Sequence, residues 1–549
     1  MSQVSIPDEL IEAILRVADW KTVYVAMRVN RDWSRAVFKM VQGHFGFERH
    51  QAIAFVEAVM LGRNVFLTGG PGTGKSYVTE CITRVLKKLS FTTCVTAPTG
   101  IAAINVKGMT TTRFIGARRV KLRPKLKVEI LEKEDYEQIA VDTDSRAIDE
   151  TDEAGQSEDD GFGNEDDEDK RETQFEGYVP VRGFQKFDKR LKVLIIDEIS
   201  MISDYKFQQI HMVVEDIHGR GAFQRGRLNG GLQLIMVGDF AQLPAIIKRD
   251  SPEDHAVILH KFSRHLFKSK YWSQMDFRMF ELTVCKRSQH AEYAHLANEL
   301  RNNILNKEAW KRITRTDYIP SEQLGIFGNY KQQGNMYEKI RFPCAFNFNN
   351  KQLDLLPAQW QALQAVDFQV EGFPIPKSLS SRIWIKIGCR IQLRSQRFNQ
   401  HHANIANGSC GFVEDMTEQE LQVRFYTSKD ESFVTTIHQD TKYARCSKTH
   451  QGPVSSRRQF AIRVSHGITA HSAQGMTIHV PFMVQCNQSW ESGQLLVMLS
   501  RASHPELMRL VDLDKVDTLK KPIISPTVMH FHSNLRKEMR SFEQIWYAI

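Results

Sequence analysis

Residues 69–76 have the composition and spacing of a loop that binds phosphate. They read Gly-Gly-Pro-Gly-Thr-Gly-Lys-Ser, which fits the pattern of a glycine, any four residues, and then Gly-Lys-Ser. In such a loop, backbone N–H groups at a helix N-terminus point at a phosphate. The lysine binds the β- and γ-phosphates, and the serine hydroxyl ligates Mg²⁺. We therefore expect a site for ATP and Mg²⁺, formed by Gly70, Gly72, Thr73, Gly74, Lys75 and Ser76.

The neighbouring sequence supplies the elements that this loop needs. Residues 64–68 form a short apolar run that predicts a buried strand. After the loop, apolar residues at helical spacing predict a helix with one core-facing stripe: Val78, Cys81, Ile82, Val85, Leu86 and Leu89. Because strand, glycine-rich turn and helix are all present, a chance match of the motif is the weaker interpretation.

Two later strands end in residues suited to the hydrolysis of a nucleotide. Residues 191–196 predict a buried strand that ends at Asp197 and Glu198. Asp197 can hold Mg²⁺ through a water molecule, and Glu198 can orient and deprotonate the attacking water. Residues 232–237 predict another core strand, followed by Gln242, an uncharged side chain placed to sense a γ-phosphate. An acid pair at one strand end is common, but downstream of a phosphate loop it indicates a hydrolytic site.

Gln51 lies on a predicted helix ahead of the loop, where it is a candidate reader of adenine. Its amide can pair with both the N6 donor and the N7 acceptor of that base, whereas taken alone it would be a surface glutamine.

Residues 92–96 predict a further strand, which ends in a loop at 97–103. Loops at the carboxyl ends of such strands bind ligands in open α/β sheets. Apolar strands interleaved with helices predict a doubly wound parallel sheet.

The second half of the chain mixes elements of both kinds. Residues 344–348 predict a strand, and residues 494–502 predict a strand that delivers Arg501. Between them, short strands and turns predict a small β-barrel over residues 395–460. We expect this barrel to be inserted in the second half.

Charge is unevenly distributed along the 549 residues. The net charge is +9, but residues 129–176 hold 21 acidic and 4 basic residues, which leaves +26 for the rest. A basic body suggests a polyanionic partner such as nucleic acid, and a generally basic soluble surface is the alternative. We place an insertion at about 115–185 and expect its acidic part, about 140–175, to be disordered. A DNA-mimicking or partner-binding role for this part is the less favoured interpretation.

The remaining composition restricts the class of protein. Eight cysteines are scattered without a Cys-x-x-Cys pair or zinc-type histidine spacing, which argues against structural zinc and for a reducing compartment. No apolar run reaches about 18 residues, so we expect no membrane span. The N-terminus lacks the apolar region of a signal peptide, and we expect an intracellular protein.

The first 45 residues predict a small helical segment. Residues 6–15 read Ile-Pro-Asp-Glu-Leu-Ile-Glu-Ala-Ile-Leu, residues 29–33 read Val-Asn-Arg-Asp-Trp, and together they resemble an F-box. That resemblance implies docking of a ubiquitin-ligase adaptor. A helical cap that packs on the next domain explains the same pattern equally well.

From about Gln51 to Leu510, the order of motifs resembles the petite integration frequency (PIF) helicases, a RecD-like branch of superfamily 1B. The most specific stretches are Asn-Gly-Gly-Leu-Gln-Leu-Ile at 229–235 with Gly-Asp-Phe-Ala-Gln-Leu-Pro at 238–244, Ala-Pro-Thr-Gly-Ile-Ala-Ala at 97–103, and His-Ser-Ala-Gln-Gly-Met-Thr at 471–477. Each motif is modest alone, but their order makes coincidence negligible.

The resemblance implies an α/β protein with two RecA-like doubly wound parallel-sheet domains and ATP between them. We place the first domain at 46–285, after the helical segment at 1–45. The second domain would comprise 286–394 and 461–549, interrupted by an SH3-like β-barrel at 395–460 that supports the DNA-binding channel.

The resemblance also implies roles for single residues of the nucleotide site. Gln51 would contact adenine, Asp197 would lie beside the metal, and Glu198 would act as the base. The residues that would contact the γ-phosphate are Gln242, Arg287 and Arg501, and those near the phosphates from the second half are Gln474 and Gly475. Arg501 is the better candidate for an arginine finger, because it can stabilise transition-state charge only when the domains close.

The family positions that touch single-stranded DNA correspond here to Thr99, Asn347 and His471. Residues 110–114 read Thr-Thr-Thr-Arg-Phe where the family usually has Thr-Ile-His-Ser-Phe. The histidine is lost, and Arg113 could replace it with a phosphate contact. Phe114, which is kept, is a further candidate for contact with DNA.

Further departures from the family pattern lie in the second half. Residues 286–288 read Lys-Arg-Ser in place of Phe-Arg-Gln, and residues 470–475 read Ala-His-Ser-Ala-Gln-Gly in place of His-Lys-Ser-Gln-Gly, so the local alignment is approximate. With the acidic insertion and the F-box-like start, such divergence would suit a viral member.

We therefore expect a monomeric, ATP- and Mg²⁺-dependent DNA helicase that moves 5′ to 3′ on single-stranded DNA and at DNA junctions. Its duties would be replication, recombination or repair, and its DNA substrate would place it in the nucleus. The alternatives are a translocase that strips proteins without separating strands, and an adaptor whose helicase body docks on DNA.

Overall fold

The computed structural model describes residues 8–29, 31–116, 189–227, 230–246, 263–285, 290–317, 324–328, 344–394, 405, 407–426, 432–444, 454–518 and 522–547. The acidic insertion expected at about 115–185 therefore lies almost wholly outside the described residues, and so does Arg287.

A six-stranded parallel sheet forms the first domain, with strand order β3-β2-β4-β5-β1-β6. Its strands are β1 (Val65–Gly69), β2 (Thr92–Ala97), β3 (Met109–Thr110), β4 (Leu191–Ile196), β5 (Gln233–Val237) and β6 (Arg278–Leu282). Every residue of β1 and β5 is buried, as expected for parallel strands that are covered on both faces.

Two hydrophobic clusters cover the opposite faces of this sheet. On β1, Val65 and Leu67 belong to one cluster and Phe66 to the other, because successive side chains of a strand point to opposite faces. The face of Val65 is covered by α4 (Arg49–Phe55), the π-helical turn η1 (Val56–Met60) and α5 (Lys75–Lys88). The face of Phe66 is covered by α9 (Asp204–His218) with Phe207, Ile210 and Val214. The predicted doubly wound parallel sheet is confirmed.

Short helices complete the first domain. They are α6 (Gly100–Asn105), α7 (Thr111–Gly116), α10 (Ala222–Arg225) and α12 (Lys270–Gln274).

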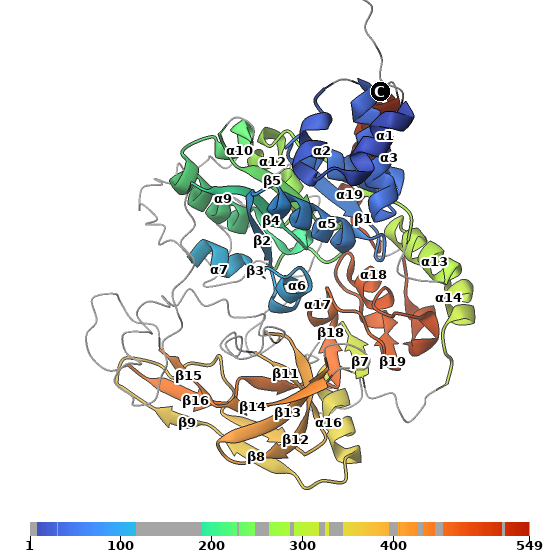
Figure 1. Cartoon of the computed structure of the whole chain (residues 1–549). Coiled ribbons are helices and arrows are strands. Elements are labelled where there is room, and N and C mark those ends of the chain that lie inside the picture. The colour runs from blue at the N-terminus through green and yellow to red at the C-terminus, as the bar shows by residue number, and fades with distance from the viewer. Residues whose placement is uncertain are drawn as a thin grey trace, which may run out of the picture.

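Both ends of the described chain pack on this first domain. The N-terminal helices α1 (Asp8–Val17), α2 (Trp20–Ala26) and α3 (Arg31–Phe45) share the cluster of Val65, and the Trp20 ring stacks on Phe45 with centroids 5.6 Å apart. The C-terminal helix α19 (Pro526–Tyr547) runs beside them, with Phe542 against Phe280 of β6 (Figure 1). The N-terminal helices thus have the packing expected of a helical cap.

A second, four-stranded parallel sheet has the strand order β18-β7-β19-β20. Its strands are β7 (Leu324–Phe327), β18 (Gly467–Thr469), β19 (Phe482–Gln485) and β20 (Met508–Val511). The helices around it include α13 (Ala291–Arg301), α14 (Lys307–Ile313), α16 (Ala345–Leu355), α17 (Ala470–Ala473) and α18 (Gln494–Leu499). Two parallel-sheet domains of this kind confirm the predicted α/β class.

Small antiparallel sheets form the insertion in the second domain, at the bottom of Figure 1. The largest joins β11 (Arg390–Leu393), β12 (Cys410–Met416), β13 (Glu420–Tyr426), β14 (Ser432–His438) and β17 (Ile462–Val464). The others pair β8 (Gln361–Gln364) with β10 (Arg382–Ile385), and β9 (Val366–Phe368) with β16 (Ser456–Gln459) and β15 (Asp440–Tyr443). The antiparallel strands thus begin well before residue 395, and they surround a hydrophobic core of their own.

Two strand predictions in the second half are wrong. Residues 344–348 begin helix α16, and residues 494–499 form helix α18. All six residues of α18 are buried, and a fully buried apolar run of this length has no periodicity that separates a helix from a strand. The helix starts after Gly493, whose φ of 79° breaks the extended chain.

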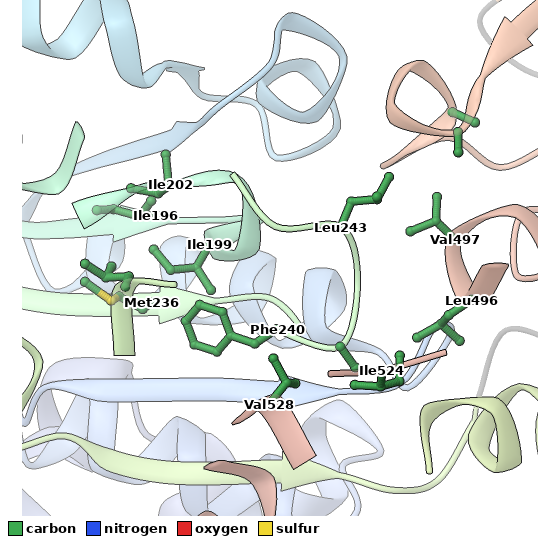
Figure 2. Close-up of a cluster of buried hydrophobic side chains, with 14 of the residues drawn as sticks. Ile196, Ile199, Ile202, Met236, Phe240, Leu243, Leu496, Val497, Ile524 and Val528 are labelled. Atoms are coloured by element: carbon green, nitrogen blue, oxygen red, sulfur yellow. The ribbon is translucent and has the colours of Figure 1, made fainter. Parts of the chain in front are cut away.

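The two RecA-like sheets meet through a shared hydrophobic cluster. Figure 2 shows Leu243, in the loop after β5, lying opposite Val497 of α18. Ile524 and Val528, from the C-terminal segment, lie near Phe240 in the same cluster. The loops that follow the strands of the first sheet are therefore in contact with the second domain.

Candidate functional site

The phosphate loop joins β1 to α5 in the predicted order. Gly72 and Gly74 adopt φ values of 78° and 87°, which favour glycine. A Cβ at Gly74 would lie 2.8 Å from Gln51 Nε2, so a larger residue there would displace the Gln51 amide. Lys75 begins α5, and its Nζ donates to the carbonyls of Gly69 and Gly70 at 2.7 and 2.9 Å.

Gln51 supports the loop directly. Its Nε2 donates to Thr73 O at 3.1 Å, and its Oε1 accepts from Glu48 N at 3.0 Å. The amide retains one N–H and one lone pair, which is the number of partners that the N7 and N6 positions of adenine offer. The structure therefore gives Gln51 a positioning contact with the loop, and the adenine contact stays a prediction.

The acid pair follows β4 at the same edge of the sheet. Asp197 is buried, and its Oδ1 accepts from Glu198 N at 2.9 Å. Burial and the neighbouring Glu198 raise the pKa of Asp197 to about 7. Burial lowers the pKa of Lys75, while the negative charges of Asp239 and Glu198 oppose that effect. The pair thus forms a dense negative site in which a cation would be favoured.

Ser76 and Asp197 fit the ligand set that Mg²⁺ uses beside a nucleotide. The described residues contain no cluster of three or more His, Cys, Asp or Glu that could hold a metal ion. Mg²⁺ does not need one, because it keeps several waters and binds through one or two carboxylates plus substrate phosphates. An exposed serine hydroxyl at the helix N-terminus and one buried carboxylate satisfy that requirement.

The second domain reaches the acid pair through Gln474, whose expected position near the phosphates stays a prediction. Its Nε2 donates to Ser200 Oγ at 3.1 Å and lies 3.4 Å from Glu198 Oε2. The next residue, Gly475, accepts from Asn105 Nδ2 at 3.2 Å. These contacts bring Gln474 and Gly475 against the first domain beside Glu198.

Gln242 lies in a tight turn that the second domain covers. Its N–H donates to Asp239 O at 2.9 Å, and its side chain is buried. A Cβ at Gly493 would lie 2.4 Å from Ala241 O and 2.6 Å from Gln242 O. The N-terminus of α18 therefore sits directly on the backbone of this turn.

Arg501 follows α18 and is buried. Its guanidinium donates to Val497 O at 2.9 Å, Ser500 Oγ at 2.9 Å and Met476 O at 3.4 Å, all within the second domain. A contact with a γ-phosphate would require these bonds to be exchanged.

The residues expected to contact DNA have different environments. Thr99 caps α6, with its Oγ1 accepting from Ala102 N at 3.3 Å, and Arg113 is exposed on α7. Phe114 is fully buried in the core, so the predicted DNA contact of its side chain is not made in this structure. The cause is amphipathicity: α7 turns Phe114 toward α9 and Arg113 toward solvent.

The other two predicted DNA contacts lie in the second domain. Asn347 is half-buried on α16. His471 is on α17, and burial lowers its pKa to about 4, so its ring is neutral at pH 7. The Trp490 ring lies 6.2 Å from it and is 46% exposed. His471 can therefore offer a hydrogen bond but not a charge.

One group beside the site was missed from the sequence. Arg301 binds the carboxylates of Asp239 and Glu281, and His532 and Arg536 complete the group. Asp239 is 62 residues from Arg301 and His532 is 231 residues away, so no local pattern links them.

Comparisons with known proteins agree with this geometry. Residues 51–248 match the model of a family described as an AAA domain. The chain is 24% identical over 489 residues to an ATP-dependent DNA helicase PIF1 of Xenopus laevis, covering 88% of this chain and 64% of that protein. It is 23% identical over 482 residues to an ATP-dependent DNA helicase Pif1 of Campylobacter jejuni, covering 84% and 92%.

A solved structure shares the fold. The Pif1 helicase from Bacteroides, in complex with ADP-AlF3 and single-stranded DNA, superposes with a TM-score of 0.59 at 19% identity, over 90% of this chain and 97% of that one. No helix in the described part of this chain is long and apolar enough to cross a membrane. The chain is thus similar in sequence to Pif1 helicases over most of its length, and it shares the fold of the Bacteroides enzyme.

Proposed function

We propose that the chain is an ATP- and Mg²⁺-dependent DNA helicase that moves 5′ to 3′ along single-stranded DNA. The observation that carries this proposal is the contact of Gln474, from the second domain, with Glu198 and Ser200 beside the phosphate loop. A hydrolytic site that is shared between two domains couples each hydrolysis to a relative movement of those domains.

Residues of the first domain bind the nucleotide and supply the base for its hydrolysis. Lys75 and the N-terminus of α5 bind the phosphates, and Glu198 orients and deprotonates the attacking water. Mg²⁺, held by Ser76 and Asp197, would neutralise charge on the β- and γ-phosphates. Gln242 would sense the loss of the γ-phosphate, and a movement of its turn would shift α18, whose N-terminus packs on that turn.

The second domain would bring positive charge to the γ-phosphate when the two domains close. Arg501, now bonded within its own domain, would exchange its carbonyl partners for the γ-phosphate, and Arg287 would act beside it. Stabilisation of the transition state would then depend on closure, which links chemistry to translocation.

DNA as the substrate is supported by the names of the relatives and by the DNA in the Bacteroides complex. The candidate contacts are Thr99, Arg113, Asn347 and His471. The basic body of the chain favours a polyanion, so affinity should fall steeply with salt.

Several finer features belong to the same proposal. They are action at junctions in replication, recombination or repair, a monomeric state, a nuclear location, a viral origin, and the domain limits given above, except those of the insertion, whose antiparallel strands run from Gln361 to Val464. For residues 1–45, the shared core with the first domain supports a structural cap, and an F-box-type adaptor is the competing role.

The test measures ATP hydrolysis with and without single-stranded DNA, and unwinding of duplexes with a 5′ or a 3′ tail. Stimulated hydrolysis with unwinding only from the 5′ tail supports the proposal. Stimulated hydrolysis without unwinding would indicate a translocase. Lys75→Ala should abolish hydrolysis, while Lys87→Ala, an exposed lysine of the same helix, should not.

A further inference from the structure

A buried cluster of charged side chains lies beside the nucleotide site. Its members are Asp239 after β5, Glu281 of β6, Arg301 at the end of α13, and His532 and Arg536 of α19. We call it the Arg301 cluster. It joins the first domain, the second domain and the C-terminal helix, and the chemistry described above uses none of its side chains.

Arg301 is the centre of the cluster. Its Nε donates to Asp239 Oδ2 at 2.9 Å, and its Nη1 donates to Glu281 Oε1. Its Nη2 lies 3.3 Å from His532 Nδ1, and the opposite nitrogen of that ring lies 3.5 Å from Asp239 Oδ1. The side chains of Arg301, Asp239 and His532 are at most 3% exposed. Arg536 then binds Glu281 from the outer side, at 2.6 and 3.1 Å.

The charges in the cluster are balanced. Burial alone would raise the pKa of Asp239, but the Arg301 guanidinium brings it below its ordinary value. Burial acts on Glu281 in the same way, and Arg536 and Arg301 lower its pKa to about 2. Burial and Arg301 lower the pKa of His532 to about 4, so its ring is neutral. Two carboxylates therefore face two guanidinium groups at pH 7.

Asp239 connects the cluster to the turn that carries Gln242. Its Oδ1 accepts from Ala241 N at 3.1 Å, and its backbone carbonyl accepts from Gln242 N at 2.9 Å. Arg301 also approaches the phosphate loop, since a Cβ at Gly70 would lie 3.9 Å from Arg301 Cδ. A single side chain thus binds the aspartate of the turn and lies close to the phosphate loop.

We propose that Arg301 is a positioning residue for ATP hydrolysis, which acts by fixing Asp239 and through it the turn that places Gln242. This inference rests on the proposed function and deepens it. α19 contributes because His532 lies against both Arg301 and Asp239, and because Val528 lies beside Phe240 within the same hydrophobic cluster (Figure 2). The nucleotide site is therefore assembled from segments that include the C-terminal end of the chain.

A purely structural role of Arg301 would have different consequences from a positioning role. Breaking a buried ion pair costs stability wherever it lies, because one charge is left without its partner. A positioning role must also lower the rate of the chemical step while leaving ATP binding nearly unchanged, since Gln242 is placed to sense the γ-phosphate. The two roles can be distinguished by measuring kcat and KM, and by comparison with a control variant that costs a similar amount of stability.

The decisive variant is Arg301→Lys, which keeps the charge but loses the fork that binds two carboxylates. Its control is Arg227→Lys, because Arg227 is also a buried arginine of the first domain and donates to Val59 O at 2.7 Å away from the turn. We expect kcat of DNA-stimulated ATP hydrolysis to fall about 10- to 100-fold in Arg301→Lys, with KM for ATP within about threefold. The control should lose thermal stability but keep its kcat.

A double variant tests whether Arg301 acts through Gln242. If it does, Arg301→Lys combined with Gln242→Ala should lower kcat no further than Gln242→Ala alone, because residues that act as a unit are not additive. Asp239→Asn should behave like Arg301→Lys and serves in its place if that variant does not fold. A normal kcat in both variants, or additive losses in the double variant, would overturn the inference. Absence of hydrolysis in the unmodified chain would instead refute the proposed function.

Discussion

Arg264 and Glu491 form a two-pronged ion pair between the two RecA-like domains, with Nη2–Oε2 at 2.9 Å and Nη1–Oε1 at 3.3 Å. Arg264 Nε also donates to Ala245 O at 3.0 Å, so the guanidinium is fixed on the loop that follows β5. Glu491 immediately precedes the segment that covers Gln242. The pair therefore holds the two domains together close to the nucleotide site.

Glu491→Gln should loosen this contact. Arg264 is about one-third exposed and can be hydrated, so we expect a loss of about 1 kcal/mol rather than the larger cost of a buried pair. Fluorescence transfer between dyes on the two domains should report a wider distribution of distances. Glu414→Gln, which breaks an exposed pair with Arg424 in the insertion, should leave that distribution unchanged.

Glu198→Gln should separate nucleotide binding from hydrolysis. Loss of the base should lower kcat by about 10²- to 10⁴-fold, while the phosphate loop still binds ATP. Single-turnover hydrolysis and binding of a fluorescent ATP analogue measure the two steps. Glu80→Gln, an exposed glutamate of α5, is the matched control, and equal losses in both variants would contradict the role of Glu198.

Gly493→Ala should disturb the interface between the domains. The added Cβ would lie 2.4 Å from Ala241 O, and φ at this position is 79°. Gly221→Ala is a close control, because Gly221 is also left-handed, with φ 69° and ψ 22°, and the nearest atom to its added Cβ would lie 3.6 Å away, an ordinary contact distance. Both should lose about 1 kcal/mol to backbone strain, whereas Gly493→Ala should lose about 1–3 kcal/mol more through overpacking. Thermal unfolding of the two variants measures the difference, and equal losses would argue against the close contact.

Arg113 and Phe114 should respond differently to substitution. Arg113→Ala should weaken binding of single-stranded DNA at low salt and reduce the salt slope by about 1, because one phosphate contact is lost. Phe114→Leu should lower stability through a core cavity without changing the salt slope. Fluorescence anisotropy at several salt concentrations tests both, and an unchanged slope in Arg113→Ala would exclude the phosphate contact.

Stability should fall on acidification through His532. Its pKa in the folded chain is about 4, below the ordinary value of 6.5, so between these values only the unfolded chain binds the proton. Stability is therefore lost as the pH falls from 6.5 toward 4, by on the order of 3 kcal/mol for this group. His532→Gln should flatten the dependence of the melting temperature on pH. His530→Gln, an exposed histidine of the same helix, should retain it.

The local parts of the site could be predicted from the sequence, and the parts made by tertiary contacts could not. The phosphate loop and the acid pair each lie within a few consecutive residues after a buried strand, so their geometry is local. Residues 494–499 were assigned to a strand because burial on every side removes the periodicity that marks a helix. The motif around Phe114 predicts a DNA contact, but its helix turns this side chain into the core.

The Arg301 cluster could not be predicted from the sequence at all, because its contacts are all long-range. Arg301 is one basic residue at the end of an amphipathic helix, and nothing beside it in the sequence marks it as buried. Its partners come from β6, the loop after β5 and the last helix, so only the assembled fold brings them together.

The position of α19 has a consequence for synthesis of the chain on the ribosome. Glu281 N donates to the thioether sulfur Sδ of Met539 at 3.3 Å, across 258 residues, so the last helix covers the edge of the first sheet. Domains usually fold in the order in which they are translated. Here the domain that is translated first keeps its β6 edge open until the final helix has emerged. Nascent chains that stop before α19 should therefore need chaperones, and a C-terminal truncation that removes α19 should leave the β6 edge of the first domain uncovered.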